Sequence, residues 1–409
     1  MDIQKVFKYV DKDDAIQFLK SLIQINTINP PGGEKALADK ISQRLENTGL
    51  MVQADIVEKD RENLIVSYSN AEISPDDSKR LIFSGHFDIV PVGNVEWTYP
   101  VFEGRQDGER IYGRGSSDMK SGVAAMIIAM ECIEKAGIKL NGILQFVGTV
   151  GEEVDCLGSK TVVKKGQIDQ ASAIVISEPT SNQPVIAHKG VLWLKISMFG
   201  KTAHGSMPLE GINAILAMNQ FMNELNNYIL QYDEHEILGG STLNIGMING
   251  GVGTNVVPDE CSITIDIRTV PGQSHTEITE NIKQLAQKVS EKMNVSFGIE
   301  VLNDMGCVYT PADDPFIELG IKTAQSLNSK EDLKPGGVNY YTDGSIYKAH
   351  LPEVPILIYG PGEPKQAHQP DEWVEIQKYL DSIQYYIALA IDYLGVQEGT
   401  NSALDSDGD

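Results

Sequence analysis

Short apolar runs that end in polar residues recur along the first half of the chain. The runs are Leu81 to Phe83, Gly142 to Val150 and Ala173 to Ser177. Their content of β-branched and aromatic residues is typical of buried strands. Between the first two runs, Val123 to Ala136 has a strongly apolar helical pattern that ends at Gly137. Strands that alternate with helices in this way predict an α/β fold.

The N-terminal part follows the same alternation. Residues 13 to 49 show helical spacing that the loop Asn29 to Gly33 interrupts, so we expect one helix before this loop and another from Lys35 to Thr48. Strands are expected at Met51 to Val57 and at Asn63 to Ser67.

The pattern changes at about residue 190. It predicts strands at Leu192 to Met198, Ser241 to Ile248, Ser262 to Arg268 and Val295 to Val301, and helices at Gly211 to Leu230 and Thr276 to Met293. This order of strand, helix, two strands, helix and strand matches a compact split βαβ sandwich, which we expect to form a separate domain.

From residue 304 the first pattern returns. It predicts a helix at Pro315 to Ser326, a loop at Gly336-Gly337, a strand at Ile356 to Tyr359 and a closing helix at Trp373 to Tyr393. We therefore expect one domain from residues 1–189 and 304–395, an inserted domain from 190–303, and a disordered acidic tail from 396–409.

Charge and composition exclude several classes of partner. The chain has 33 basic and 57 acidic residues, a formal net charge of -24, which argues against nucleic acid or an anionic membrane as a partner. No apolar stretch is long enough to span a bilayer and the N-terminus does not resemble a signal peptide, so we expect a cytoplasmic protein. The four cysteines lack CxxC spacing, which indicates neither a disulfide framework nor a thiolate zinc site.

Polar residues with metal-binding chemistry follow the predicted strands. His86 and Asp88 come after the first run, Glu152 and Glu153 after the second, and Glu178 after the third. Ligands in open α/β sheets bind beyond the carboxyl ends of the strands, so these side chains are expected to converge at one crevice. Two further candidates are Asp118, one turn before the apolar helix, and His368, in the loop before the last helix.

This set of side chains contains oxygen and imidazole ligands without a thiolate. Such ligands suit zinc, manganese or cobalt. Two divalent ions that share one carboxylate would each take a histidine and an acidic residue, with a bridging water as the nucleophile.

The motifs SGHFDIVP, GRGSSDMKSG, GEEVDCLGS, SEPT, GKTAHGSMP, GTNVVP and HQPDEWV carry a resemblance to a known family. Together they resemble the M20 metallopeptidases, close to the branch of acetylornithine deacetylases and succinyl-diaminopimelate desuccinylases. The resemblance runs from residue 14 to about residue 394 with the motifs in family order. It implies a zinc-peptidase-like catalytic domain, a mixed sheet flanked by helices, with an inserted α+β ferredoxin-like lid and dimerisation domain.

The resemblance also implies roles for individual residues. Asp118 would bridge two divalent ions, with His86 and Glu178 completing one site and Glu153 and His368 the other. Zinc is the expected metal, with cobalt and manganese as alternatives. A cis peptide bond is implied after Asp118.

Further residues would act on the reaction without holding the metals. Glu152 would be the general base, and Asp88 would orient the imidazole of His86. His204, from the lid of a partner subunit, would hydrogen-bond the oxyanion. Asn255 and Arg268 would hold the substrate carboxylate. The dimer would form through the lid helix at 211–230.

The expected activity is hydrolysis of the amide of an N-acyl-L-amino acid. Glu178, rather than Asp, resembles the deacylase and carboxypeptidase branches more than the aminopeptidase branch, and the segment Ala187 to Gly190 is similar to acetylornithine deacetylases. Ser345 replaces the arginine that desuccinylases usually have, which weakens a succinyl substrate without excluding it. A dipeptidase or carboxypeptidase on the same site is the alternative enzyme, and a catalytically dead binding protein is the alternative of another class.

Overall fold

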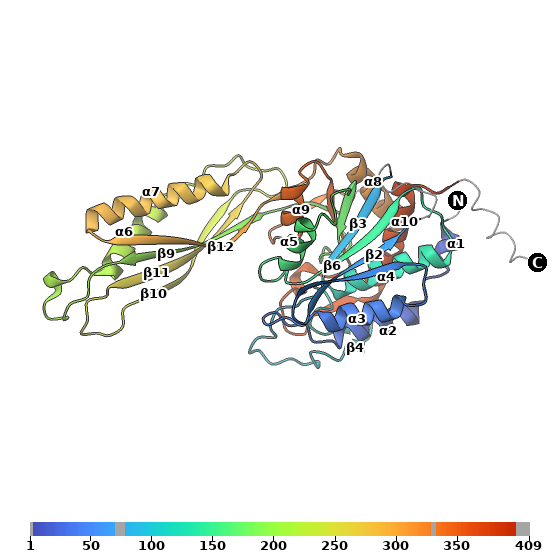
Figure 1. The fold of residues 1–409 in the computed structure, drawn as a ribbon, viewed down its shortest axis with the longest axis horizontal. Helices are drawn as coiled ribbons and strands as arrows, with labels where there is room; N and C mark the ends of the chain where they lie inside the picture. Colours follow the sequence, from blue (N-terminus) through green and yellow to red (C-terminus); the bar gives the residue numbers. More distant parts are fainter. Residues whose placement is uncertain (1–2, 70–77, 329–332, 398–409) are drawn as a thin grey trace, which may run out of the picture. The chain divides into compact units, whose positions relative to one another are not determined.

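The computed structural model describes residues 3–69, 78–328 and 333–397 (Figure 1). Its described residues fall into two compact units. The first takes them from Met1–Ile186, Thr310–Gly336 and Thr342–Asp409, and the second from Ala187–Tyr309 and Gly337–Tyr341. The predicted insertion at 190–303 thus lies within the second unit. Residues 337–341 also belong to this unit, which the sequence did not predict. Of the tail expected to be disordered, all but Val396 and Gln397 lies outside the described residues.

The described helices and strands are as follows. The helices are α1 (Gln4–Phe7), α2 (Lys12–Ile23), α3 (Lys35–Leu45), α4 (Lys120–Lys135), α5 (Leu157–Lys164), α6 (Ala214–Asn226), α7 (His275–Met293), α8 (Pro315–Asn328), α9 (Gly344–His350) and α10 (Ile376–Leu394). The strands are β1 (Met51–Glu58), β2 (Arg61–Tyr68), β3 (Arg80–His86), β4 (Arg105–Asp107), β5 (Arg110–Tyr112), β6 (Ile143–Thr149), β7 (Ala173–Ile176), β8 (Val185–His188), β9 (Gly190–Phe199), β10 (Thr242–Gly250), β11 (Glu260–Thr269), β12 (Ser296–Met305), β13 (Val308–Tyr309), β14 (Gly336–Val338), β15 (Ile356–Ile358) and β16 (Trp373–Glu375). Among these helices, none is both long and apolar enough to cross a membrane.

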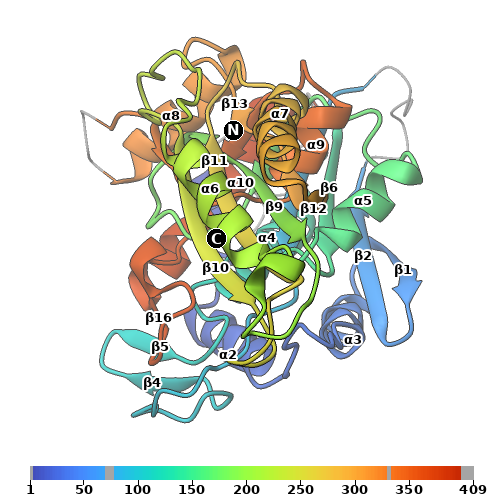
Figure 2. The same cartoon turned by 90° about the vertical axis from the view of Figure 1, so that its left-hand side faces the viewer.

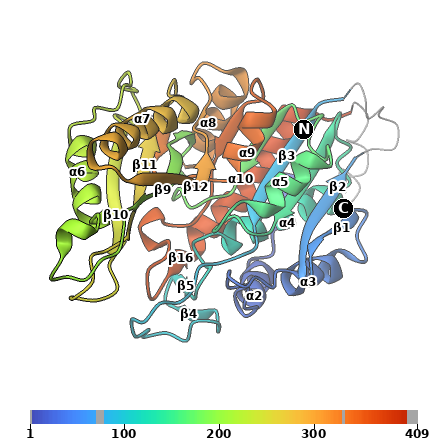
Figure 3. The same cartoon turned by 60° about the vertical axis from the view of Figure 1, so that its left-hand side comes forward.

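The main sheet is mixed and has the order β1-β2-β6-β3-β7-β15-β8-β13, with β14 paired to β8. Figure 3 labels β1, β2 and β3 of this sheet. Its centre is parallel, because β3 pairs in parallel with β6 and β7, and β7 with β15. The carboxyl ends of β6, β3, β7 and β15 therefore point to one edge of the sheet, which is where ligands bind in open α/β folds.

Helices cover both faces of this sheet. On β3, the Phe83 ring lies 5.3 Å from that of Tyr386 on α10, whereas the next residue, Ser84, is 3.0 Å from the hydroxyl of Tyr347 on α9. The alternation of side chains along a strand sends these neighbours to opposite helical layers. The prediction of a mixed sheet flanked by helices is confirmed.

Helix α4 lies in the core of the first unit and is buried from Lys120 to Ile133. It packs against β3, β6, α2 and α10, so apolar residues are needed on all of its sides. The helix ends as predicted at Gly137, which has a φ of 66° and lets Ile138 N–H reach the carbonyl of Ile133 at 3.2 Å.

The second unit has a four-stranded sheet of order β10-β11-β9-β12, and Figure 2 shows α6 and α7 lying along it. All pairings are antiparallel. Strand β11 alternates as predicted, with Cys261, Ile263, Ile265 and Ile267 in the core beneath the two helices. The element order and the strand order are those of a ferredoxin-like split βαβ arrangement.

Several predicted elements have different bounds. Helix α6 spans Ala214–Asn226 rather than 211–230, because the Asn213 side chain caps its start by accepting Leu216 N–H at 3.1 Å. Residues 373–375 form β16, paired with β5, before α10 begins at Ile376. Gly336 and Gly337 belong to the short strand β14 rather than to a loop.

Candidate metal centre

His86 is the last residue of β3 and is 1% exposed. Its Nδ1 lies 3.0 Å from the main-chain carbonyl oxygen of Asp88. A carbonyl can only accept, so Nδ1 carries a proton and donates it there. Nε2 then faces Asp118 Oδ1 at 3.1 Å and is the nitrogen available to a metal.

The orientation of His86 differs in detail from the expectation. The Asp88 carboxylate is 3.6 Å from Nδ1, so the ring donates its hydrogen bond to the main-chain carbonyl of Asp88 rather than to the carboxylate. Strand β3 ends at His86, so the alternation of side chains along the strand does not extend to residue 88.

The Asp88 carboxylate instead holds the segment after β6. Its Oδ1 accepts Glu152 N–H at 3.1 Å and its Oδ2 accepts Glu153 N–H at 3.2 Å. Oδ2 also accepts the Asn29 amide at 2.9 Å. Asp88 is fully buried, and these contacts fix the main chain of the two consecutive glutamates.

Glu178 follows β7, and Asp118 immediately precedes α4. The Asp118-Met119 peptide bond is cis, which confirms that prediction. Glu178 Oε1 lies 3.9 Å from His86 Nε2, so the ends of β3 and β7 present their ligand atoms to each other.

His368 lies in the loop between β15 and β16, and this loop packs closely on neighbouring strand ends. A Cβ atom on Gly360 would lie 2.3 Å from the carbonyl oxygen of Ser177, and one on Gly362 would lie 2.2 Å from that of Ser117. Only glycine permits this approach. His368 itself has a φ of 65° and is half-exposed.

All five predicted ligands come together at this edge of the sheet. Ligand atoms lie within 4.8 Å of one another in two groups, His86 with Glu152 and Glu178, and His86 with Asp118 and Glu153. His368 Nε2 adjoins the second group, 3.0 Å from Glu153 Oε2 and 3.4 Å from Asp118 Oδ2. The two oxygens of Asp118 therefore face different histidines, the arrangement expected of a bridging carboxylate.

The electrostatics of this cluster are unfavourable without a cation. Burial, together with the charge of Asp118, raises the pKa of Glu153 to about 7. Burial also raises the pKa of Glu152 and of Glu178 well above the usual range. Contacts with Asp118 and Glu153 raise the pKa of His368 to about 10, and despite burial the two imidazoles lower the pKa of Asp118.

The residues present fit divalent metal ions. Several buried carboxylates face one another, and Glu153 Oε1 is buried with no hydrogen-bond partner among the described residues. The donors are carboxylate oxygens and imidazole nitrogens, which suit zinc, cobalt or manganese. His86, Asp118, Glu153, Glu178 and His368 would hold the ions.

The remaining predicted residues belong to the second unit. His204 and Asn255 lie on adjoining turns, since His204 forms a β-bridge with Val256 and Gly205 N–H donates to the Asn255 carbonyl at 2.7 Å. Both side chains are exposed. Arg268 Nε is 2.9 Å from Asp266 Oδ1, so its guanidinium is already paired with an acid on the same strand.

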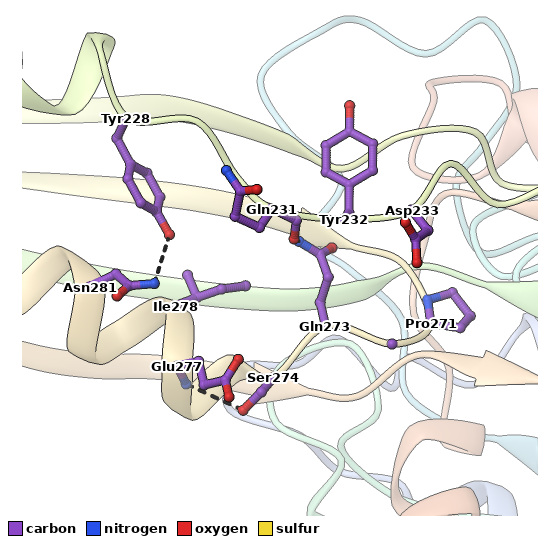
Figure 4. Close-up of a pocket in the computed structure, with 11 residues that line it drawn as sticks. Tyr228, Gln231, Tyr232, Asp233, Pro271, Gln273, Ser274, Glu277, Ile278 and Asn281 are labelled. Atoms are coloured by element: carbon purple, nitrogen blue, oxygen red, sulfur yellow. Dashed lines mark hydrogen bonds between the residues drawn. The ribbon is translucent and has the colours of Figure 1, made fainter.

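The second unit also contains a hollow of about 340 Å³ between the start of α7 and the segment after α6 (Figure 4). Its lining includes Tyr228 and Asn281, which are 3.5 Å apart, and the carboxylates of Asp233 and Glu277. The lining contains no histidine or cysteine, so it does not repeat the chemistry of the metal centre.

Two buried residues near the proposed ligands were not among the functional residues predicted from the sequence, although both lie within the quoted motifs. Arg114 lies in GRGSSDMKSG and Glu372 in HQPDEWV, and the two side chains are 2.8 Å apart. An arginine and a glutamate separated by 258 positions give no local sequence signal of pairing.

The fold and the site define an α/β protein with a histidine- and carboxylate-lined centre at the carboxyl edge of a partly parallel sheet. The family model described as "Peptidase family M20/M25/M40" matches residues 82–392. The chain belongs to this family of metal-dependent hydrolases, which confirms the family and the enzyme class predicted from the motifs.

Similar proteins cover nearly the whole chain. A probable succinyl-diaminopimelate desuccinylase of Staphylococcus aureus is 28% identical over 93% of this chain and 98% of its own. An acetylornithine deacetylase of Buchnera aphidicola is 30% identical over 88% of this chain and 93% of its own. A Bacillus subtilis structure described as a dinuclear metal-binding peptidase of the M20 family has the same fold, with a TM-score of 0.72, 17% identity, and coverage of 94% of this chain and 98% of that one.

Proposed function

We propose that the protein hydrolyses the amide bond of N-acyl-L-amino acids at a centre of two divalent metal ions. The observation that carries this proposal is the position of Asp118, whose Oδ1 is 3.1 Å from His86 and whose Oδ2 is 3.4 Å from His368. One carboxylate between two imidazoles, with Glu178 and Glu153 on either side, supports a site for two ions that share Asp118. Zinc is the expected metal, with cobalt and manganese as alternatives.

Two ions held there would polarise the scissile carbonyl and lower the pKa of the attacking water. Glu152 is the side chain suited to move protons in this reaction. It is 5% exposed and its amide is fixed by Asp88, so its position is set before substrate binds. Cations nearby would lower its raised pKa again, leaving it able to accept a proton at neutral pH.

The proton balance assigns two steps to Glu152. Its carboxylate takes a proton from the attacking water as the new C–O bond forms at the amide carbon. The same proton is then given to the nitrogen as the C–N bond breaks, so the products are a carboxylic acid and a free amine.

The substrate class rests on the relatives. The desuccinylase and the deacetylase named above are, by their names, enzymes that remove acyl groups, and the second is 30% identical to this chain. Glu178 and the Ala187–Gly190 segment favour the deacylase branch. We propose that Asn255 and Arg268 bind the free carboxylate of the amino acid, in which case Arg268 has to share or exchange its contact with Asp266.

We further propose that two copies of the chain associate through the second unit. Strand β10 is the outer strand of its sheet, and along it Met247 and Ile248 are 59% and 54% exposed. Leu216 on α6 and Val252 beyond β10 are further exposed apolar side chains of this unit, with 58% and 86% exposure. An edge strand beside apolar side chains suits pairing with an identical strand about a twofold axis. His204 of a partner subunit is then the proposed donor to the oxyanion.

The test of the function is a substrate panel with the purified protein, supplied with zinc, cobalt or manganese in turn. We expect turnover of acetyl-amino acids to exceed turnover of unblocked dipeptides. The reverse preference would support a dipeptidase or carboxypeptidase. A protein that contains two metals but cleaves no member of the panel would support a binding role without catalysis.

The role of Glu152 is tested in the same assay. Glu152→Ala is expected to lower kcat by about 10² to 10⁴, because it removes the group that moves the proton. Metal content should stay near two ions per chain, since Glu152 is not a proposed ligand. Asp155→Asn, an exposed carboxylate on the same turn, is the matched control. Loss of metal with the activity would instead make Glu152 a ligand.

A further inference from the structure

Arg114 and Glu372 belong to different ligand-bearing loops and meet beneath the metal centre. Arg114 lies shortly before Asp118, and Glu372 lies shortly after His368. Both are buried, with 2% and 0% exposure, and Arg114 Nη1 donates to Glu372 Oε2 at 2.8 Å.

The Glu372 carboxylate holds the loop of Asp118. Its Oε1 accepts the backbone N–H groups of Ser117 at 2.8 Å and Asp118 at 2.9 Å. Its Oε2 accepts Gly115 N–H at 3.0 Å in addition to Arg114. With four donors, both oxygens are fully occupied, so Glu372 has no lone pair left for a metal ion.

The Arg114 guanidinium holds the loop of His368 in return. Nη1 donates to the carbonyl of Gln369 at 3.1 Å, and Nη2 is 3.4 Å from the carbonyl of His368. Nη2 also lies 3.5 Å from the carbonyl of Pro91, downstream of β3. The guanidinium thereby connects the segments after β3 and after β15 with the loop of Asp118.

His368 needs such support because of its backbone conformation. A φ of 65° is strained for a residue with a side chain and persists only when its surroundings hold it. The carbonyl of His368 itself accepts from Arg114, so the strained residue is directly tied to the ion pair.

We propose that Arg114 and Glu372 form a reciprocal clasp. Glu372 fixes the loop that carries Asp118, and Arg114 fixes the loop that carries His368. The clasp sets the separation of Asp118 and His368, and with it the affinity for the metal ions. Arg114 and Glu372 are positioning residues, since neither touches substrate or metal. This inference rests on the proposed metal site.

The variants are chosen to separate the clasp from a general contribution to stability. In Glu372→Gln, the amide oxygen can still accept Ser117 and Asp118, but its NH₂ group faces the donors of Gly115 and Arg114. Arg114→Lys keeps a positive charge beside Glu372 and loses the forked contact with the carbonyls. The matched control is Glu131→Gln, because Glu131 is also buried and pairs with Arg44 at 2.8 Å, between α4 and α3.

The measurement is the affinity for cobalt, followed by visible absorption during competition with a chelator. We expect Glu372→Gln to bind cobalt about 10 to 100 times more weakly than wild type. The affinity of Arg114→Lys should lie between those of wild type and Glu372→Gln. Glu131→Gln should bind within about twofold of wild type, even though removing its charge lowers the melting temperature. Circular dichroism confirms that each variant is folded.

The outcomes distinguish the clasp from the metal site. Wild-type protein that binds no cobalt would overturn the proposed function. Wild-type protein that binds two ions, with Glu372→Gln binding them equally tightly, would overturn the clasp alone. An equal loss of affinity in Glu131→Gln would also overturn it, because the effect would then follow stability. If Glu372→Gln does not fold, Arg114→Lys against the same control decides the question.

Discussion

Glu153 should make the metal-free protein less stable as the pH rises. The folded state raises the pKa of this carboxyl from 4.5 to about 7. Below pH 4.5 Glu153 is protonated in both the folded and the unfolded state. Between pH 4.5 and about 7, Glu153 is protonated mainly in the folded state. Deprotonation at higher pH then favours unfolding, so this contribution to stability is present at low pH and lost as the pH rises to about 7.

The size of the effect follows from the shift. A change from 4.5 to about 7 corresponds to about 3 kcal/mol at 1.36 kcal/mol per pH unit. About 2 to 3 kcal/mol of this falls between pH 5 and pH 8. The Glu153 side chain is only 7% exposed, so solvent screening does not reduce the figure much.

Glu153→Gln removes the titrating carboxyl, because glutamine has the same size and carries no charge at any pH. Urea denaturation of both proteins in excess chelator gives the free energy of unfolding at pH 5 and pH 8. We expect Glu153→Gln to gain about 2 to 3 kcal/mol over wild type between these two values. Glu96→Gln, on an exposed loop, controls for the change in net charge. Equal pH dependence of wild type and Glu153→Gln would refute the reasoning.

Three further predictions concern the neighbouring segments and the assembly. Asp88→Asn should lower kcat about 10- to 100-fold, because one oxygen that accepts Glu152 or Glu153 N–H becomes a donor; wild-type kinetics would contradict this. Met247→Glu should convert a dimer into a monomer by light scattering, and a monomeric wild type would exclude the dimer. Where the dimer is present, mixing His204→Ala with the Glu152→Ala variant should restore part of the activity, and no restoration would exclude action across subunits.

The sequence was most informative where long-range structure follows from a local pattern. Apolar runs followed by acids indicated parallel strands, and parallel strands bring their carboxyl ends to one edge, so His86, Glu152 and Glu178 could be predicted to meet. The same reasoning could not supply the distances between them. It also overextended α6, because propensity alone does not show where Asn213 turns its side chain to cap the helix.

Interactions that depend on main-chain groups could not be predicted. The Asp88 carboxylate accepts hydrogen bonds from the backbone N–H groups of Glu152 and Glu153. Nearly every residue has a backbone N–H group, so the sequence does not show which of them a carboxylate will bind. Arg114 and Glu372 are similar, since most of their partners are backbone carbonyls and amides. Sequence patterns indicated the side chains that we propose as metal ligands, whereas the groups that position those side chains became visible only in the structure.

This difference has a physical origin in the charge of the centre. Buried carboxylates such as Glu153 and Glu178 repel one another when both are ionised, so the proposed ligands are not held together by their own charges. Their geometry has to come from contacts that do not depend on the metal. Asp88 and the clasp of Arg114 and Glu372 are such contacts, because each is buried and bonded to backbone that continues into a strand or helix. If the proposed metal site is correct, a centre arranged in this way would have its ligands in place before metal binds, and the free energy of metal binding would then go to relieving repulsion rather than to ordering loops.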